Sequence, residues 1–430
     1  VPGGRFNEMY GWDSYFIALG LMAHDQYDLA KGMVENMAYQ IKYYGKMLNA
    51  NRSYYLTRSQ PPFYTALLAD FYRQYEARLS TQWLVEHLAI AIDEYEQVWM
   101  NPQTHLFADL GLNRYFDEGC GRPKETEPGH FKLEIQKYAD RLGISAEEYE
   151  RRYDAGEISE PELDRYFVHD RAMRESGHDT SARLDAVCAD LACVDLNAVL
   201  YDVELKISAL IDDYFPHGFR HNGREYSGSE WYEKAQARYD LVQQYLWNEE
   251  AGCFYDYNVR RGRPQAFASA TNLYPLWAGL CEPEQAEKLV REQLPKLMCA
   301  GGISSTAPLP PHIHGPERQW DYPYGWAPHQ MLLWEGLHRY GYHQEMHDAA
   351  YAWVQMIVRA TVEYNGLIPE KFNVVKGSHK TNVEYGNVGA VFEYLPAGGF
   401  GWTNASLILG IAKLTEVQKA QLNGLAETVD

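Results

Sequence analysis

The chain has 430 residues and a formal net charge of -20 at pH 7, with 59 acidic against 39 basic side chains. This balance argues against nucleic acid or an anionic membrane surface as a general partner, because the long-range electrostatic interaction would be repulsive. A neutral partner fits better, and the length allows either one large core or two to three domains.

Cysteine and histidine spacing gives no sign of a metal or cofactor. The six cysteines form no C-x-x-C pair, and the 15 histidines form neither H-E-x-x-H nor a zinc-finger spacing. We therefore expect no metal site, no cofactor and no disulfide framework. Cys188 and Cys193 are expected to be core thiols of a helical stretch, which fits a reducing compartment. No apolar run approaches the ~18 to 20 residues that span a bilayer, so no membrane insertion is expected.

Apolar residues recur at spacings of three and four along most of the chain, which predicts helices nearly throughout. In chain order, the predicted helices lie near residues 11–23, 26–44, 61–77, 82–99, 194–214, 229–247, 268–280, 284–297, 327–340, 344–363 and 402–414. Ser80 is a candidate N-cap of the fourth helix. Several helices are separated by only two or three residues, so they should pack as antiparallel pairs, and no period of 20 to 50 residues favours an open repeat. We predict an all-α fold, a closed double ring of helices known as the (α/α)6 toroid.

Long polar connections interrupt this helical pattern near residues 101–130, 215–228, 299–325 and 365–401. Connections of this length in a compact domain are usually functional. If helical hairpins run up and down around a ring, alternate loops meet at one rim. We therefore expect these loops to build a pocket there.

Residues 319–328 read QWDYPYGWAP, an aromatic and acidic run on a predicted surface turn. Aromatic faces stack on the C–H patches of sugars, while carboxylates and amides bind their hydroxyl groups. The run therefore favours a carbohydrate ligand. An aromatic loop that plugs the core is the alternative interpretation.

Two carboxylates lie in predicted loops: Asp179 is two residues after a glycine, and Glu370 directly follows a proline. Glycoside hydrolysis needs one carboxylic acid to protonate the leaving oxygen and one carboxylate to activate water or attack the anomeric carbon. Among 59 acidic residues a pair is weak evidence. An N-cap role for Asp179 and a solvated or Lys371-paired Glu370 are the structural alternatives.

Seven blocks in order resemble the trehalases, inverting glycosidases that cleave α,α-trehalose. The resemblance spans residues 1 to about 410, and the blocks lie at residues 2–16, 49–55, 58–62, 175–179, 319–328, 370–372 and 398–404. The resemblance implies a single catalytic domain over residues 1–430, with Asp179 as the general acid and Glu370 as the general base. The acid must stay protonated near neutral pH, which needs burial or a nearby like charge, while the base must stay ionised. An inverting enzyme should hold the two carboxyl groups roughly 6.5 to 9.5 Å apart, whereas ~5 Å would indicate retention.

The same resemblance implies a sugar-binding shell. Its members are Arg5, Phe6, Trp12, Asp13, Asn49, Arg58, Ser59, Gln60, Glu125, Arg174, Gly177, Trp326 and Glu384. The arginines can donate forked hydrogen bonds, the carboxylates accept from hydroxyl groups, and the aromatic rings exclude water. Structural roles stay open for several of them: ion pairing for Arg58, helix core for Trp12, and loop bracing for Asn49. The spacing around Glu125 departs from the bacterial pattern, so that assignment could slip by one residue.

Within the family, the chain is most similar to the fungal neutral trehalases, on the basis of His178 before the catalytic aspartate and of residues 135–171 and 382–387. That subgroup is cytosolic and is regulated through an N-terminal extension that carries a calcium-binding segment and recruits a 14-3-3 partner. The D-x-D-x-D-G pattern of a calcium loop does not occur in this sequence. We therefore expect a cytoplasmic catalytic domain without its regulatory extension.

Alternatives to a trehalase remain on sequence grounds. Other double-ring glycosidases, such as glucoamylase-like and mannosylglycerate-type hydrolases, share aromatic pockets but lack the two diagnostic blocks together. A phosphorylase would need a phosphate cradle, for which no clear Gly-rich loop is present. A non-catalytic sugar-binding or scaffold protein would tolerate loss of Asp179 or Glu370, and both are present. A regulator-dependent domain would bind trehalose and turn it over slowly or not at all.

Overall fold

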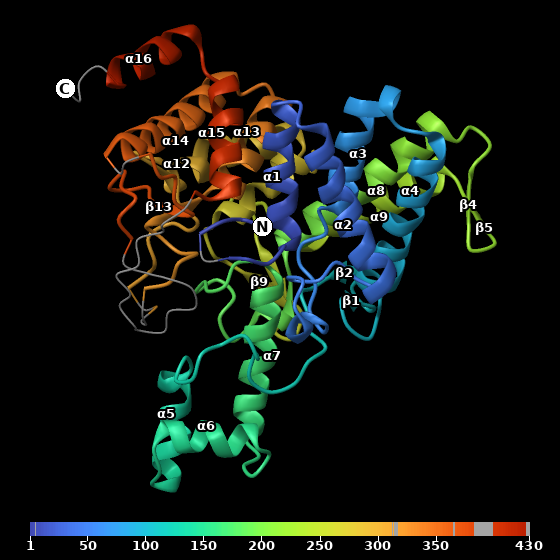
Figure 1. The fold of residues 1–430 in the computed structure, drawn as a ribbon. Helices are drawn as coiled ribbons and strands as arrows, with labels where there is room; N and C mark the ends of the chain where they lie inside the picture. The colour runs from blue at the N-terminus through green and yellow to red at the C-terminus, as the bar shows by residue number, and fades with distance from the viewer. Residues whose placement is uncertain (5, 312, 314–316, 364–365, 382–398, 427–430) are drawn as a thin grey trace.

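Six helices form an inner ring in the computed structural model, which describes residues 1–4, 6–311, 313, 317–363, 366–381 and 399–426. Each inner helix contacts the next, and the last returns to the first. In order around the ring they are α1 (Gly11–Ala23), α3 (Tyr64–Tyr75), α8 (Val194–Tyr214), α10 (Tyr274–Ala278), α13 (Ala327–Arg339) and α15 (Gly401–Ala412). Helices α1 and α15, from opposite ends of the chain, lie side by side and close the ring (Figure 1).

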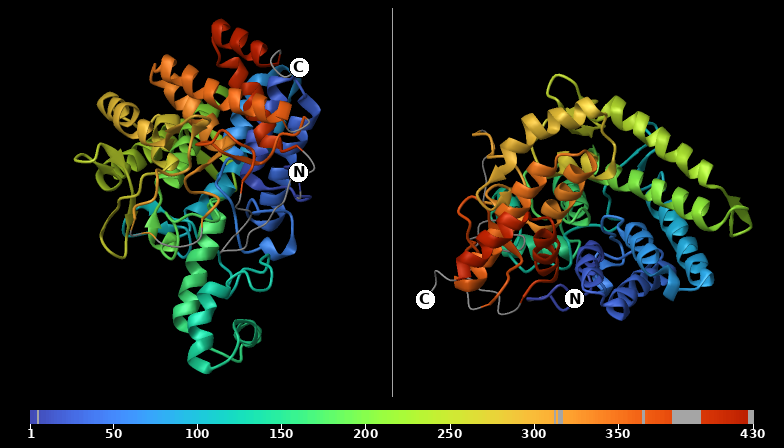
Figure 2. Two further views of the ribbon diagram at one scale, coloured as in Figure 1. Left: turned by 90° about the vertical axis from the view of Figure 1, so that its left-hand side faces the viewer. Right: turned by 90° about the horizontal axis from the view of Figure 1, so that it is seen from above.

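Each inner helix is followed in the chain by an outer one, as the view from above shows (Figure 2). The outer helices are α2 (Tyr27–Tyr44), α4 (Thr81–Glu94), α9 (Gly228–Tyr245), α11 (Pro283–Lys288) with α12 (Leu294–Leu297), α14 (His343–Glu363) and α16 (Glu416–Ala426). The π-helical turns η3 (Tyr95–Trp99) and η6 (Leu289–Gln293) extend α4 and join α11 to α12. Inner and outer helices run in opposite directions. Each outer helix therefore brings the chain back to the rim where the next inner helix starts, so the inner helices all start at one rim. The predicted closed double ring is confirmed.

Local sequence explains several helix boundaries and contacts. The Ser80 side chain accepts a hydrogen bond from the Trp83 amide, which confirms the predicted cap of α4. Gly20 lets α1 approach α15 closely, since a Cβ at this position would lie 2.6 Å from the Cβ of Ala405. No helix among the described residues is long and apolar enough to cross a membrane.

Short antiparallel strands occupy the connections between helices. They pair as β1 (Leu106–Phe107) with β2 (Leu112–Asn113), β4 (Phe219–His221) with β5 (Arg224–Tyr226), β6 (Trp247–Asn248) with β7 (Cys253–Phe254), β10 (Met298–Cys299) with β11 (Gly302–Ile303), and β12 (Tyr324–Trp326) with β13 (Lys371–Asn373). A three-stranded sheet has the order β3 (Leu191–Ala192), β8 (Asp256–Asn258) and β9 (Arg263–Gln265). Short 3-10 turns lie at η1 (Ser53–Tyr55), η2 (Glu76–Arg78), η4 (Cys188–Asp190) and η5 (Ala270–Leu273).

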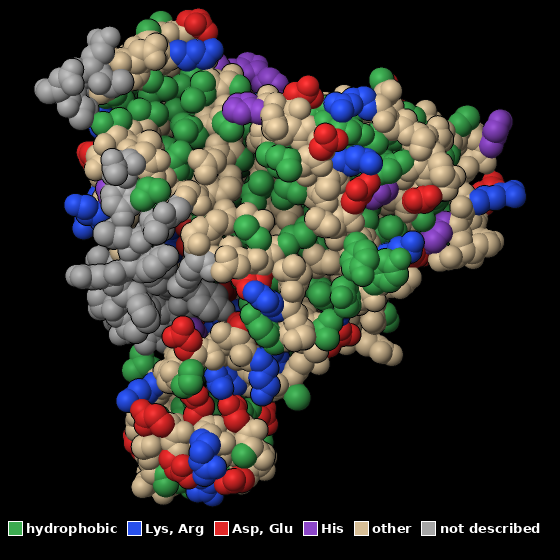
Figure 3. Space-filling view, viewed as in Figure 1, with side chains coloured by type: hydrophobic (Ala, Val, Ile, Leu, Met, Phe, Trp, Pro, Cys, Tyr) green, Lys and Arg blue, Asp and Glu red, His purple; other side chains and the backbone are tan. Residues whose placement is uncertain are grey.

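Three further helices form an arm that projects below the ring: α5 (Lys132–Leu142), α6 (Ala146–Asp154) and α7 (Pro161–Glu175) (Figure 1). The arm has its own hydrophobic cluster, which includes Phe131, Ile135, Tyr149 and Phe167. Its surface carries acidic and basic side chains interspersed (Figure 3), among them the ion pairs Lys132–Glu147 and Arg151–Glu148. The last turn of α7 leads the chain back to the rim.

Three sequence expectations need correction. The sequence analysis did not predict the arm helices; among them, α7 buries charged side chains such as Asp170 and Arg174, which weakens its apolar periodicity. Cys188 and Cys193 are buried free thiols, as expected, but they lie in a 3-10 turn and an extended stretch instead of a helix. The run near residues 319–328 is not a surface turn, because Trp320 and Asp321 are buried.

Glu94, in the last turn of α4, gives a prediction about stability. Burial raises its pKa to about 8, and its Oε1 has no hydrogen-bond partner. A folded-state pKa above the ordinary value means that the free energy of unfolding falls as pH rises from ~4.5 toward ~8. Glutamine cannot ionise, so Glu94→Gln should match the wild type near pH 5 and be more stable by about 3 kcal/mol at pH 7. Urea unfolding at both pH values measures this difference. Glu86→Gln, on the exposed face of the same helix, is the control, and an equal effect of Glu94→Gln at both pH values would contradict the assignment.

Candidate active site

A cavity of about 180 Å³ opens at the rim where the inner helices begin. Its walls come from the residues that precede the inner helices or form their first turns. They are Pro2, Phe6, Tyr10, Trp12, Asp13, Asn49, Tyr54, Tyr55, Arg58, Gln60, Glu125, Arg174, Gly177, Asp179, Gln319, Trp320, Trp326, Glu370, Phe400 and Trp402.

Asp179 lies on the cavity wall in the loop between α7 and α8. Burial raises its pKa to about 7, although Arg174, with Nη1 3.9 Å from Oδ2, opposes this shift. The side-chain amide of Gln319 donates to the main-chain carbonyl of Asp179. A carboxyl group with a pKa near neutrality can hold a proton at pH 7 and release it in a reaction.

Glu370 reaches the same cavity from the residue just before β13. Its carbonyl accepts hydrogen bonds from Trp402 Nε1 at 3.1 Å and Thr403 Oγ1 at 3.2 Å, which tie this segment to the start of α15. The Lys371 ammonium lies 3.4 Å from Glu370 Oε2, so the Lys371 pairing considered from the sequence is present. The side chain of Glu370 nevertheless lines the cavity.

Arginines connect the carboxylates of one cavity wall. Arg58 donates to Asp117 at 2.8 Å and to Glu125 at 2.5 Å, and Arg174 donates to Asp170 at 2.7 Å. Burial disfavours ionisation of Glu125, but Arg58 and Arg174 outweigh it and hold the pKa of this carboxyl below its ordinary value. The wall therefore presents fixed donors and acceptors for hydroxyl groups.

Packed aromatic rings also line the cavity. Trp320 and Trp326 stack with their ring centroids 4.0 Å apart, and the ring of Trp402 meets Trp326 edge-on at 5.7 Å. Trp12 joins this group through edge contact with Trp402 at 5.8 Å. Such faces suit the C–H surfaces of a sugar ring.

Two amide side chains brace the segments around the first turn of α1, where the Asp13 carboxyl is buried. Gln60 Oε1 accepts from the Trp12 amide at 2.9 Å, and Asn49 Nδ2 donates to the carbonyls of Ser59 and Arg174. Burial, followed by the charge of Glu370, raises the pKa of Asp13 well above its ordinary value. Asn49 thus has the bracing role considered from the sequence and also lines the cavity.

Gly177 explains how the chain passes the Trp12 ring. Its φ is +76°, and a Cβ on it would lie 2.7 Å from ring atoms of Trp12. Both the left-handed backbone and the lack of space exclude a larger residue at this position.

The structure gathers most of the predicted site residues in the one cavity: Phe6, Trp12, Asp13, Asn49, Arg58, Gln60, Glu125, Arg174, Gly177, Asp179, Trp326 and Glu370. Ser59 is not on its wall, because the Ser59 hydroxyl donates to the Met47 carbonyl and its amide donates to Glu175. Arg5 and Glu384 lie outside the described residues. Gln319, Trp320 and Trp326 belong to the run at 319–328 that was predicted to meet a carbohydrate, and all three line the cavity. Sequence reasoning did not single out Pro2, Tyr10, Tyr54, Tyr55, Phe400 and Trp402 as site residues, although all lie in the matched blocks. Asp321 lies away from the cavity and accepts from Ser181 and Ala182.

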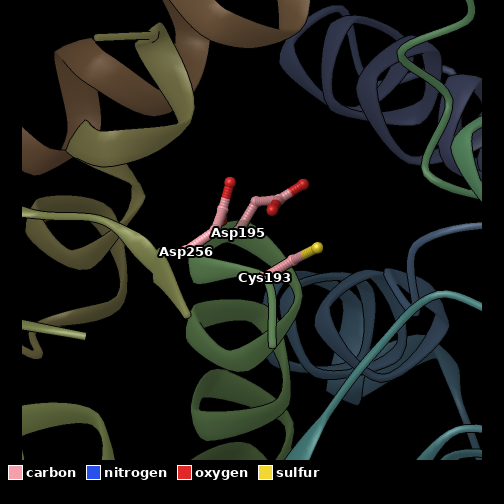
Figure 4. A group of neighbouring side chains, drawn as sticks. All are labelled: Cys193, Asp195 and Asp256. Carbon is pink, nitrogen blue, oxygen red and sulfur yellow. The ribbon is translucent and has the colours of Figure 1, made fainter. Parts of the chain in front are cut away.

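Cys193, Asp195 and Asp256 converge in a buried group that has the donor atoms of a metal site (Figure 4). Arg183 already supplies the opposite charge, since its guanidinium lies 2.7 Å from both carboxylates. The Val194 amide also donates to Asp256 at 2.9 Å. The group therefore joins the start of α8 to β8 as an ion-pair cluster.

Comparison with known proteins adds independent information. A family model described as Trehalase matches residues 1–415. The chain is 45% identical to a probable trehalase of Eremothecium gossypii, over 98% of this chain and 58% of that protein. It is 44% identical to a cytosolic neutral trehalase of Saccharomyces cerevisiae, over 96% of this chain and 56% of that protein. The chain thus spans a little over half the length of these curated relatives.

Solved structures agree on the fold. The neutral trehalase Nth1 from Saccharomyces cerevisiae superposes with a TM-score of 0.88 at 41% identity, over 99% of this chain and 75% of that one. A mannosylglycerate hydrolase from Thermus thermophilus has a TM-score of 0.59 at 16% identity, over 96% and 95% of the two chains, and shares the fold alone. With the double ring, the cavity and the match over nearly its whole length, the chain belongs to the trehalase family.

Proposed function

We propose that the protein hydrolyses α,α-trehalose to two glucose molecules with inversion, using Asp179 as the general acid and Glu370 as the general base. The observation that carries the proposal is that Asp179 and Glu370 line one cavity together with Arg58, Arg174 and a group of tryptophans. Membership of the trehalase family and the names of the relatives support the substrate.

The proposed reaction has one displacement. Asp179 donates its proton to the bridging oxygen as the glycosidic bond breaks, while Glu370 takes a proton from a water molecule that attacks the anomeric carbon from the opposite face. One glucose leaves as the β anomer and the other as the α anomer. The stacked tryptophans exclude bulk water, and Arg58, Arg174 and Glu125 bind hydroxyl groups.

The pH dependence of kcat follows from the state of Asp179. Since its pKa is raised to about 7 by burial, the acid is protonated below this pH and ionised above it. We expect kcat to fall above pH 7, approaching tenfold per pH unit, because the ionised form has no proton to donate. Initial rates at saturating trehalose from pH 5 to 9 measure this. A kcat that stays constant up to pH 9 would exclude Asp179 as the acid.

Proton NMR in deuterated water tests the whole proposal. Trehalose is added and the anomeric protons are followed from the first seconds, before mutarotation. Equal initial release of α- and β-glucose is expected, whereas α-glucose alone would mean retention. If no glucose forms but trehalose raises the melting temperature, the chain is a binding or regulator-dependent domain. If neither occurs, the trehalose proposal fails.

Location and regulation are part of the proposal. The relatives named cytosolic neutral trehalases support a cytosolic location. A calcium-binding segment and a 14-3-3 partner stay predictions from the resemblance to that subgroup. Adding 14-3-3 and Ca²⁺ to the NMR assay would show whether they change the initial rate.

A further inference from the structure

Gln319 links two segments of the cavity wall that are distant in the sequence, the loop of Asp179 and strand β13. Its side-chain Nε2 donates to the carbonyl of Asp179, and its Oε1 accepts from Lys371 Nζ at 3.1 Å. Its own carbonyl accepts from Trp326 Nε1 at 2.7 Å, which fixes the Gln319 backbone. The next amide, of Trp320, donates to the Thr180 carbonyl at 3.1 Å, so the contact to the Asp179 loop is doubled.

Lys371 continues the connection to the second carboxyl group. It lies in β13 opposite Trp326 of β12, and its side chain is 3% exposed. Its Nζ lies 3.4 Å from Glu370 Oε2 and 5.1 Å from the centroid of the Trp326 ring. A buried ammonium group is costly unless it is paired, so its position between Gln319, Glu370 and the ring is strongly constrained.

We propose that Gln319 and Lys371 form a positioning bridge that fixes the loop of Asp179 relative to the carboxylate of Glu370. This inference rests on the proposed function, because it assigns a purpose to the spacing between the proposed acid and base. The bridge runs from the Asp179 carbonyl through the Gln319 amide and the Lys371 ammonium to Glu370 Oε2.

The bridge has a chemical consequence for the base. Lys371 Nζ lies 3.4 Å from Oε2 of Glu370, and no described residue donates a hydrogen bond to Oε1. One oxygen of the carboxylate is therefore held, while the other can accept the proton of a water molecule in the cavity. An inverting reaction needs this water between the base and the anomeric carbon, so a small displacement of either carboxyl group costs rate.

The alternative is that Lys371 only neutralises buried charge and stabilises the fold. A structural role of this kind lowers the melting temperature and the amount of folded enzyme, but it leaves the kcat of the folded fraction near its normal value. A positioning role lowers kcat per folded site with little change in KM. The two roles therefore differ in a measurable ratio.

Steady-state kinetics of Lys371→Met, Lys371→Arg, Gln319→Met and the double variant with both methionines test the bridge. We expect kcat on trehalose to fall about 10- to 100-fold in either methionine variant, with KM within about twofold. The double variant should be about as slow as the slower single variant, because each single substitution already breaks the same hydrogen-bonded bridge. Lys371→Arg keeps the charge and the donors, so it should recover at least part of the lost rate. Lys376→Met, an exposed lysine in the same segment, is the matched control and should keep wild-type kinetics.

A substrate with a good leaving group distinguishes the role of the general acid from that of the general base. In α-D-glucosyl fluoride the C–F bond breaks and fluoride leaves with little need for proton donation, while water still needs the base. Asp179→Asn should therefore recover much of its rate on the fluoride, whereas Glu370→Gln and Lys371→Met should stay slow. Recovery of Lys371→Met on the fluoride would overturn its assignment to the base.

The outcomes distinguish a failure of the proposed function from a failure of the proposed bridge. If the wild type fails on both trehalose and the fluoride, the proposed function fails. If the wild type is active and both methionine variants keep kcat within twofold per folded site, or if their losses multiply in the double variant, the bridge is wrong. If Lys371→Met does not fold, Gln319→Glu decides the question. It keeps the acceptor for Lys371 but loses the donor to the Asp179 carbonyl, so kcat should fall at least tenfold, and normal kcat would overturn the bridge.

Discussion

Replacing Asp179 by asparagine or Glu370 by glutamine is expected to lower kcat on trehalose by about 10²- to 10⁴-fold, the usual contribution of a positioned acid or base. The asparagine amide is too weak an acid to transfer a proton to the bridging oxygen, and the glutamine amide is too weak a base to take one from water. Both substitutions keep the side-chain shape, so the fold and trehalose binding should persist. Single-turnover rates and calorimetric binding of trehalose to each variant measure the two effects separately.

Two carboxyl groups outside the cavity provide controls for these variants. Asp185→Asn changes a residue of the same loop region as Asp179, where the carboxylate pairs with Arg318. Glu363→Gln changes an exposed residue at the end of α14. Both controls should turn over at the wild-type rate. Near-normal turnover of Asp179→Asn or Glu370→Gln would remove that residue from the catalytic role.

The second large effect concerns stability. Arg183→Met should lower the free energy of unfolding by about 3–5 kcal/mol, the usual result of breaking a buried ion pair from one side. Arg183 is 2% exposed, and its loss leaves the carboxylates of Asp195 and Asp256 without their shared cation. The deficit should shrink as pH falls, because Arg183 holds the pKa of the Asp195 carboxyl below its ordinary value against the effect of burial, and without Arg183 this carboxyl can take up a proton. Denaturant unfolding at pH 5 and pH 7.5 measures both expectations.

Arg220→Met is the matched control, since the Arg220–Glu225 pair is solvent-exposed and such pairs contribute little. It should change stability by less than about 0.5 kcal/mol. A similar small change for Arg183→Met would mean that the cluster of Cys193, Asp195 and Asp256 is not held by this arginine. Added Zn²⁺ should not restore Arg183→Met if the cluster is an ion-pair site.

The sequence predicted the ring well where helices have one buried face. The segments near 194–214 and 327–340 match α8 and α13 closely, because their apolar residues recur at the helical period. The arm helix α7 was missed because it buries Asp170, Arg171 and Arg174 in polar contacts. Periodicity of apolar residues carries no signal for a helix of this kind.

The sequence by itself determined the class of fold, the family and the identity of most residues around the cavity. Helical period is local, and the matched blocks carry the chemistry in their residue types. Only the tertiary structure decided which residues touch the cavity: Ser59 turns to the Met47 carbonyl, while its neighbours Arg58 and Gln60 face the site. The same holds for Gln319, whose partners Asp179 and Lys371 lie 140 and 52 positions away in the chain. Hydrogen-bond partners and burial at helix ends depend on how distant segments meet when the ring closes, and no local pattern records that geometry.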